Sequence, residues 1–209
     1  MQTRRRQIED VASALFSSRG YAATSMRDIA RALDLQGGSL YAHIPSKEAV
    51  LAAIVEEAAE EFHAAVRPVA ERPGPAAGRL REMIAAHVHV VTGGRERAKV
   101  FLFEWTFLGE ERRAAVSRSR AAYQAYFERV MAEGVAAGEL ATPDPKLAAV
   151  FILSAMNAMA HWYRPDGAIG PDALAEHYAD LFLSGLQPSE RTPMRAGAFE
   201  TATGKEERQ

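Results

Sequence analysis

A short segment near the amino terminus, QGGSLYAH at residues 36–43, places hydrogen-bonding side chains directly after two glycines. A glycine costs a helix about 1 kcal/mol relative to alanine, so Gly37 and Gly38 need a reason to stand at the start of a helical stretch. Without Cβ atoms, the backbone can approach a phosphate closely and leave its amide N–H groups free to face an anion. The side chains that can then reach base edges or phosphate oxygens are Gln36, Ser39, Tyr41, His43 and Lys47.

Two helices must position this segment. Apolar residues at helical spacing predict a first helix from about residue 3 to residue 19, ended by Gly20. A short second helix opens at Ser25, which has the spacing of a capping box with Asp28. We expect a third short helix over residues 37–42 that buries Leu40, and Ser46 as the N-cap of a long fourth helix. Two short helices behind a longer one are typical of a helix-turn-helix, whose second helix lies in the major groove of DNA.

Basic residues gather at the same end of the chain. Residues 1–50 carry a formal charge of +2, whereas the remainder carries -4. Arg4, Arg5 and Arg6 are candidates for an arm along the DNA backbone or in a minor groove, with Arg27 and the hydroxyl of Ser25 nearby. The alternative is that these helices form only a three-helix packing unit and that the arginines are a solvated terminus.

The stretch GYAATSMRDIARALDLQGGSLYAHIPSKEAVL resembles the DNA-binding domain of the TetR family of bacterial transcriptional regulators over roughly residues 5–55. The resemblance implies that Gln36, Ser39, Tyr41, His43 and Lys47 contact DNA. Two residues depart from the family pattern. Asp34 stands where the family usually has a glycine in a left-handed turn, a conformation that aspartate tolerates better than most residues. Gly37 replaces a larger, often basic, side chain, so one expected contact is missing.

The whole chain reads as an all-α protein with no cysteine. We expect a helix-turn-helix domain over residues 1–50 and a linking helix over about 46–66. The proline-rich stretch at 67–78 marks the boundary of a larger ligand-binding and dimerisation domain over 67–187. Its helices are predicted at about 76–92, 96–108, 110–137, 144–163 and 171–186, and residues 188–209 read as a disordered tail.

The stretch PKLAAVFILSAMNAMAHWY is apolar on nearly every face, so we expect it to be covered on all sides. One recognition helix reads too few base pairs for useful specificity, and two related by a twofold axis read a near-palindromic operator. The prediction is therefore a homodimer, although burial of this helix within one chain is the alternative. The predicted interface consists of Val150, Phe151, Ser154, Ala158, Leu174, Tyr178, Leu181 and Phe182.

Aromatic residues are concentrated in KVFLFEWTFLGEERR at 99–113, and either a plain core or an apolar ligand pocket fits this pattern. If it is a pocket, the predicted lining is Phe101, Phe103, Glu104, Trp105, Leu108, Tyr123, Phe127, Asn157, His161 and Trp162. An isolated histidine such as His161 is more often a structural residue than a ligand. In a regulator, the occupancy of such a pocket can change the spacing of the two DNA-binding domains.

The stretches NAMAHWYRPDG and ALAEHYADLFLSGL resemble a TetR subgroup that controls fatty-acid, steroid and aromatic-acid breakdown by sensing acyl-CoA thioesters. This resemblance implies an acyl chain in the aromatic pocket and CoA phosphates near basic residues. The candidates are Arg95, Arg97, Arg112, Arg113 and Arg164. A sensor of diverse hydrophobic drugs that controls an efflux pump is the alternative.

Other classes of protein find little support. The sequence has no P-loop, no H-E-x-x-H motif and no nucleophile elbow around Ser39, so we expect no enzyme. His87 and His89 are two residues apart on a predicted helix and therefore point away from each other, so we expect neither a metal nor another cofactor. No apolar run is long enough for a membrane span, which favours a cytoplasmic protein. A helical interaction module without affinity for double-stranded DNA stays an alternative.

Overall fold

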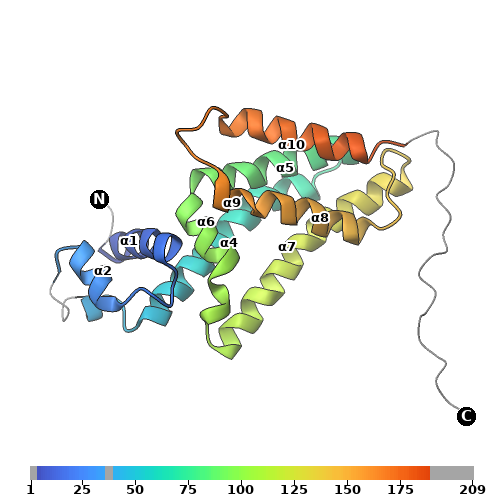
Figure 1. The fold of residues 1–209 in the computed structure, drawn as a ribbon. Helices are drawn as coiled ribbons and strands as arrows, with labels where there is room; N and C mark the ends of the chain where they lie inside the picture. The colour runs from blue at the N-terminus through green and yellow to red at the C-terminus, as the bar shows by residue number, and fades with distance from the viewer. Residues whose placement is uncertain (1–3, 36–39, 189–209) are drawn as a thin grey trace, which may run out of the picture.

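The computed structural model describes residues 4–35 and 40–188. These residues form helices and turns and contain no strand, as the sequence predicts. The molecule is elongated, with the amino-terminal helices at one end and the remaining helices bundled beside them (Figure 1). We call α1, α2 and residues 40–47 the head, and α5 to α10 the body. Helix α4 passes from one to the other.

The head begins with α1 (Arg4–Arg19), which Gly20 ends in a left-handed conformation with φ +85°. Helix α2 (Met26–Ala32) carries the predicted capping box, because Ser25 and Asp28 exchange side-chain and backbone hydrogen bonds. The turn after α2 contains Asp34 at φ 53°, so aspartate does occupy the left-handed position. Residues 40 and 41 are helical, and Leu40 is fully buried beneath them.

Helix α4 (Lys47–Glu71) is capped by Ser46, whose hydroxyl accepts from the Ala49 N–H at 3.1 Å. It runs five residues past the predicted end at residue 66, with Pro68 inside the helix. Proline removes one hydrogen bond there, but burial of Val66 and Ala70 on the core side keeps the last turn in place. Arg79 also donates to the carbonyl oxygens of Ala70 and Arg72 at the end of the helix.

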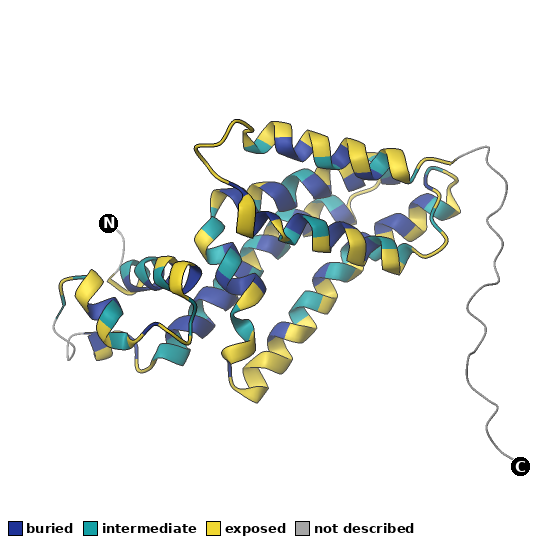
Figure 2. Ribbon diagram, in the orientation of Figure 1, coloured by how far each residue is buried: buried dark blue, intermediate teal, exposed yellow. Residues whose placement is uncertain are grey.

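The body packs α5 (Ala76–Gly93) and α7 (Glu110–Ala136) against α4, and α10 (Pro171–Gly185) runs along α5 (Figure 1). The predicted helix at 96–108 is shorter, because α6 (Arg95–Phe103) gives way to a 3-10 turn, η1 (Trp105–Phe107). The predicted helix at 144–163 is divided at Ala158 into α8 (Pro145–Asn157) and α9 (Met159–Trp162). Buried residues follow the inner faces of all these helices (Figure 2).

Candidate DNA-binding surface and effector cavity

Four of the predicted DNA contacts lie together on the head. Ser25, Arg27, Tyr41 and Lys47 line one open depression of about 600 Å³. The Tyr41 side chain is 55% exposed, and the side chains of Arg27 and His43 are also exposed. Tyr41 and Arg27 therefore lie where a phosphate backbone can reach them. The predicted contacts Gln36, Gly37, Gly38 and Ser39 lie outside the described residues.

Lys47 also has a structural role in the head. Its ammonium group donates to the carbonyl oxygens of Tyr21 and Thr24 at 2.9 and 2.8 Å, and it lies 4.1 Å from the centre of the Tyr21 ring. Burial is the main cause that raises the pKa of Tyr21. Lys47 thus ties the start of α4 to the turn between α1 and α2. The Ser25 hydroxyl is likewise engaged with Asp28.

The arginines at the amino terminus do not form an extended arm, because Arg4, Arg5 and Arg6 are the first turn of α1. Arg4 donates to Gln7 at 3.0 Å and Arg5 pairs with Glu9 at 2.9 Å, one helical turn further on. Arg6 pairs with Glu57 of α4. Local pairing of this kind is compatible with helical geometry, and it accounts for the difference from the predicted arm.

The body contains a partly open cavity of about 340 Å³ between α4, α5, α6, α7 and α8. Three of the predicted pocket residues line it, namely Phe101, Tyr123 and Asn157. The aromatic ring of Phe62 contacts those of Phe101 and Tyr123, with ring centres 5.3 and 5.7 Å apart. Other lining residues are Ala59, His63, His87, Leu102, Ser117, Ser119, Arg120, Ala121, Gln124, Val150, Leu153 and Ser154.

The other seven predicted pocket residues do not line the cavity. Phe127 and Leu108 are buried in the core, and Trp105 lies in η1. Phe103 is 38% exposed and stacks on His161 at the surface, and Trp162 is also exposed. The remaining prediction, Glu104, accepts a hydrogen bond from the Tyr21 N–H at 3.0 Å. The predicted pocket residues therefore divide among the core, the cavity and the surface.

Sequence reasoning missed four important members of the cavity wall, Phe62, His63, His87 and Arg120. They come from α4, α5 and α7, and each lies among residues that read as ordinary core or surface positions. The only local signal is a polar residue on an otherwise apolar face, as at His87. Their common position on the cavity wall becomes apparent only when the three helices are packed together.

The polar groups of the wall are strongly affected by burial. Burial lowers the pKa of His87 to about 3, with the Asn157 side chain acting in the opposite direction, so the imidazole is neutral at pH 7. Burial also raises the pKa of Tyr123 well above its usual range and lowers that of Arg120. The Arg120 guanidinium lies 5.4 Å from the ring centre of Phe101 and 5.6 Å from that of Trp105. Within the described residues no carboxylate pairs with it.

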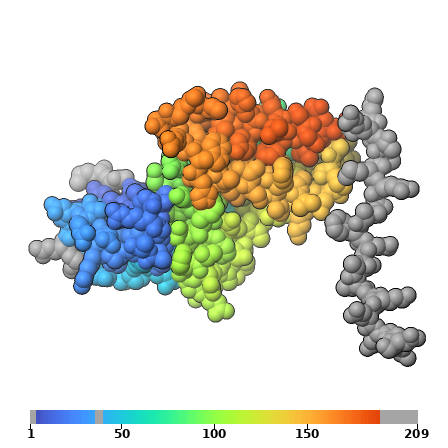
Figure 3. Space-filling view, viewed as in Figure 1, coloured from blue at the N-terminus to red at the C-terminus, as the bar shows by residue number. Residues whose placement is uncertain are grey.

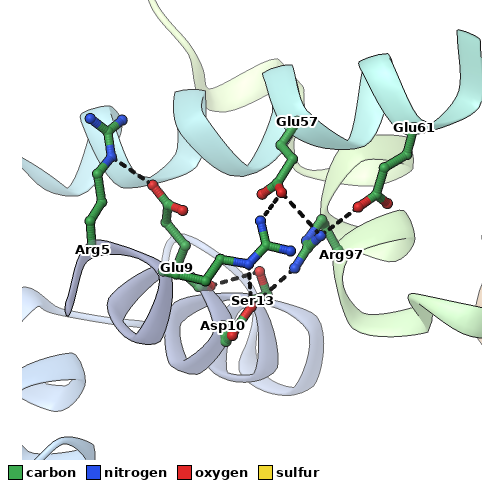
Figure 4. Close-up of polar contacts among 8 residues, drawn as sticks. Arg5, Glu9, Asp10, Ser13, Glu57, Glu61 and Arg97 are labelled. Atoms are coloured by element: carbon green, nitrogen blue, oxygen red, sulfur yellow. Dashed lines mark hydrogen bonds and ion pairs between the residues drawn. The ribbon is translucent and has the colours of Figure 1, made fainter. Parts of the chain in front are cut away.

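Helix α6 connects the cavity to the head. Its inner face places Phe101 and Leu102 on the cavity wall. Arg97, on the same helix, pairs with Glu61 of α4 at 2.6 Å and with Asp10 of α1 at 3.0 Å (Figure 4). Lys99 donates to the Ser17 carbonyl oxygen at the end of α1 at 2.8 Å. Helix α6 is therefore in direct contact with both the cavity and the base of the head.

The predicted dimer residues separate into two groups. The side chains of Val150, Phe151 and Leu181 are 39%, 66% and 72% exposed, and Ser154 and Ala158 are also exposed. Leu174 and Phe182 are instead buried within the chain, and Tyr178 is half-buried. Helices α8 and α10 form one side of the body in the space-filling view (Figure 3). Val150 and Ser154 also line the cavity, so its mouth borders this surface.

Residues 4–35 and 40–188 contain neither a cluster of side chains suited to a metal nor a helix suited to a bilayer. These residues contain no group of three or more histidine, aspartate or glutamate side chains placed to hold a metal ion. None of their helices combines the length and the apolar character that crossing a bilayer requires.

Comparison with known proteins identifies relatives over nearly the whole chain. Residues 8–54 match the family described as bacterial regulatory proteins, tetR family, and residues 73–186 match the tetracyclin repressor-like C-terminal domain. The HTH-type transcriptional repressor KstR2 of Rhodococcus jostii is 27% identical over 185 residues, covering 88% of this chain and 91% of that protein.

Solved structures of related proteins support the same family assignment. The TetR family regulator PfmR from Thermus thermophilus is 31% identical, covers 87% of this chain and 99% of its own, and has a TM-score of 0.79. The structure of AibR in complex with isovaleryl coenzyme A and operator DNA is 27% identical, covers 86% and 97%, and has a TM-score of 0.78. The chain therefore belongs to the TetR family of bacterial regulatory proteins and is a transcriptional regulator, not an enzyme.

Proposed function

We propose that this protein is a homodimeric repressor whose binding to a palindromic operator is relieved when an acyl-CoA thioester occupies the body cavity. The observation that carries the proposal is the double role of α6, which lines the cavity with Phe101 and Leu102 and holds the head through Arg97. Relatives with this fold include a repressor named KstR2 and AibR bound to isovaleryl coenzyme A and operator DNA.

The cavity suits the acyl part of such a thioester. Its volume of about 340 Å³ is near the lower end of the range for ligand cavities, roughly 300–1,000 Å³. The cavity is therefore large enough for a hydrocarbon chain or ring, while the bulky CoA portion extends through the mouth. Arg120, half-buried beside two aromatic rings and without a carboxylate partner among the described residues, suits an electron-rich or anionic group of the ligand.

The predicted phosphate-binding arginines differ in availability. Arg97 is committed to Asp10, Glu57 and Glu61, and Arg112 pairs with Glu48 at 3.3 Å. Arg113 and Arg164 are exposed, and Arg95 is partly buried. These three are the better candidates for CoA phosphates.

Dimerisation is expected through α8 and α10. Four large apolar side chains on these helices are exposed in the single chain: Leu147, Val150, Phe151 and Leu181. Exposed apolar groups on adjacent helices mark an interaction surface in a protein surrounded by water. A twofold arrangement through this surface would present two heads to one near-palindromic DNA site.

A mobility-shift assay with decanoyl-CoA tests the proposal. We expect micromolar decanoyl-CoA to release the wild-type protein from its operator. The Arg97→Ala variant should bind decanoyl-CoA with unchanged affinity in calorimetry, but the ligand should weaken its DNA binding less, because the contact between α6 and the head is lost. Allosteric coupling is typically about 5- to 150-fold, and the variant should lose most of that factor.

Two controls complete the assay. Tyr41→Ala should abolish operator binding without changing ligand affinity, because its exposed ring lies in the head depression. Release by cationic hydrophobic dyes but not by decanoyl-CoA would support a drug sensor instead, although an arginine in the cavity wall disfavours cations. Failure of decanoyl-CoA and longer or ring-bearing acyl-CoAs to bind would refute the acyl-CoA assignment.

A further inference from the structure

Two buried polar atoms on the cavity wall have no hydrogen-bond partner among residues 4–35 and 40–188. They are Nε2 of His87, on α5, and Oδ1 of Asn157, at the end of α8. The His87 side chain is almost completely buried, with 1% of its surface exposed. Buried polar atoms in folded proteins are nearly always paired, because an unpaired one has lost its water and gained nothing in return. These two atoms therefore need an explanation.

The hydrogen bond on the other side of the imidazole defines what His87 offers to the cavity. Nδ1 of His87 lies 2.9 Å from the Tyr123 hydroxyl. Both groups are neutral at pH 7, because burial lowers the pKa of His87 and raises that of Tyr123. The Tyr123 hydroxyl has no other acceptor among the described residues, so its proton is used only if it donates to Nδ1. The ring proton then resides on Nε2, and the cavity wall presents one donor, Nε2–H, beside one acceptor, Oδ1.

The donor and the acceptor belong to one neighbourhood. The Asn157 side chain is close enough to His87 to raise its pKa in the way a hydrogen-bond partner does, but no contact between the two side chains within the described residues has normal hydrogen-bond geometry. A small group with both a proton and a lone pair can satisfy the two atoms together.

A second histidine on the wall shows that the chain can satisfy such a ring. Nε2 of His63 lies 3.0 Å from the Ser119 hydroxyl and 3.2 Å from its carbonyl oxygen, and Nδ1 lies 3.4 Å from the Tyr126 hydroxyl. The imidazole of His63 is therefore fully paired within the protein. The contrast shows that the unpaired nitrogen of His87 is not imposed by burial alone.

We infer that His87 and Asn157 recognise a hydroxyl group on the effector, which accepts from the His87 Nε2–H and donates to Asn157 Oδ1. The neighbouring wall is apolar, with Phe62, Phe101 and Leu153, and it suits the hydrocarbon part of the same molecule. The inference rests on the proposed function for the place of the ligand and adds its class. The preferred effector is an oxygenated acyl group, and the plain hydrocarbon of the same length binds less well.

Calorimetric titration with matched thioesters tests this inference. The probes are decanoyl-CoA and a series of hydroxydecanoyl-CoA isomers with the hydroxyl at successive carbons of the chain. We expect at least one isomer to bind the wild-type protein about tenfold more tightly than decanoyl-CoA, the factor that about 1.4 kcal/mol represents. The advantage should fall to about one in His87→Leu and in Asn157→Leu, because each variant removes one half of the donor–acceptor pair.

The controls separate recognition from folding. His89→Leu removes a half-exposed histidine of the same helix that pairs with Asp172 outside the cavity, so the tenfold preference should persist. If His87→Leu fails to fold, the less buried Asn157→Leu variant, checked by circular dichroism and by decanoyl-CoA binding, decides the matter. An equal affinity for all thioesters in the wild-type protein, or a preference that survives in Asn157→Leu, overturns the inference alone. If no thioester binds, the acyl-CoA assignment in the proposed function falls with it.

Discussion

The head and the body treat their polar groups in opposite ways. In the head, Ser25 and Asp28 satisfy each other, and Lys47 donates to two backbone carbonyl oxygens of the turn. In the body, Nε2 of His87 and Oδ1 of Asn157 on the cavity wall have no hydrogen-bond partner within the described part of the chain, and no carboxylate there pairs with Arg120. In the head, these polar groups are paired within its own turns. The cavity of the body holds polar groups that a bound effector could pair, as proposed above.

The first prediction concerns how much two aromatic residues of the body contribute to its stability. Phe127 is fully buried and touches Tyr123, whereas Phe103, predicted for the same pocket, is 38% exposed. Phe127→Ala should lower the free energy of unfolding by about 3–5 kcal/mol, since it opens a cavity in the core. Phe103→Ala should cost about 1 kcal/mol or less, from the lost contact with His161. Urea denaturation of both variants measures the difference, and equal losses would mean that the core is misassigned.

The second prediction concerns the pH dependence that a buried histidine produces. The pKa of His87 falls from its ordinary 6.5 to about 3 on folding, so the unfolded chain takes up the proton first as the pH decreases. Its contribution to stability is complete above about pH 6.5 and is lost progressively as the pH falls towards 3. Between pH 7 and pH 5 the loss should be about 2 kcal/mol.

Urea denaturation of wild-type protein and His87→Leu at these two pH values isolates this contribution. The variant should lose about 2 kcal/mol less than the wild type between pH 7 and pH 5. His89→Leu, which removes a half-exposed histidine, should keep the wild-type dependence. Identical pH profiles for wild type and His87→Leu would show that His87 is not buried in its neutral form.

The third prediction tests whether the hydrogen bonds of Lys47 stabilise the head. Lys47→Met keeps the hydrocarbon stem but removes the donor to the Tyr21 and Thr24 carbonyl oxygens. Because the site is half-buried, the free energy of unfolding should fall by about 1.5 kcal/mol, at the lower end of the range for hydrogen bonds to charged groups. Lys146→Met, at an exposed lysine near the start of α8, should change the free energy of unfolding by less than about 0.5 kcal/mol. A loss no larger than that control would contradict a structural role for Lys47.

The smallest expected effect lies on the body surface. Arg81 and Asp180 form an ion pair at 2.6 Å between α5 and α10, but their side chains are 47% and 67% exposed. Because solvent screens this pair, it should contribute less than about 0.5 kcal/mol to the free energy of unfolding. Arg81→Ala should therefore leave the urea midpoint almost unchanged. A loss above about 1 kcal/mol, the upper end of the range for exposed pairs, would show that α10 depends on this pair more than on the apolar packing of Leu174 and Phe182.

Local signals in the sequence were reliable wherever one residue type is required by backbone geometry. The capping box at Ser25, the N-cap at Ser46 and the left-handed Asp34 are all confirmed. The end of the long fourth helix was wrong, because burial of Val66 and Ala70 outweighs the helix-breaking tendency of Pro68. The domain limits, the DNA contacts and the dimer residues stay predictions.

The cavity was harder to predict, and only three of its residues were recognised. The periodicity of α6 indicates that Phe101 points inward, but it cannot indicate which helix it meets or whether the space between them is filled. His63, His87 and Arg120 belong to other helices and carry no shared local pattern. Their association depends on how α4, α5 and α7 cross.

Helix caps, turn residues and apolar periodicity act over a few neighbouring positions, so the amino-acid sequence was enough to predict the helical fold class, the capped helices of the head and the family. The packing of the helices was needed to show which aromatic residues enclose a cavity and that α6 contacts both this cavity and the head. It was also needed to show that His87 and Asn157 carry atoms on the cavity wall that no described residue pairs. These features depend on side chains that are distant in the chain and become neighbours only when the helices pack, and no local propensity encodes that distance.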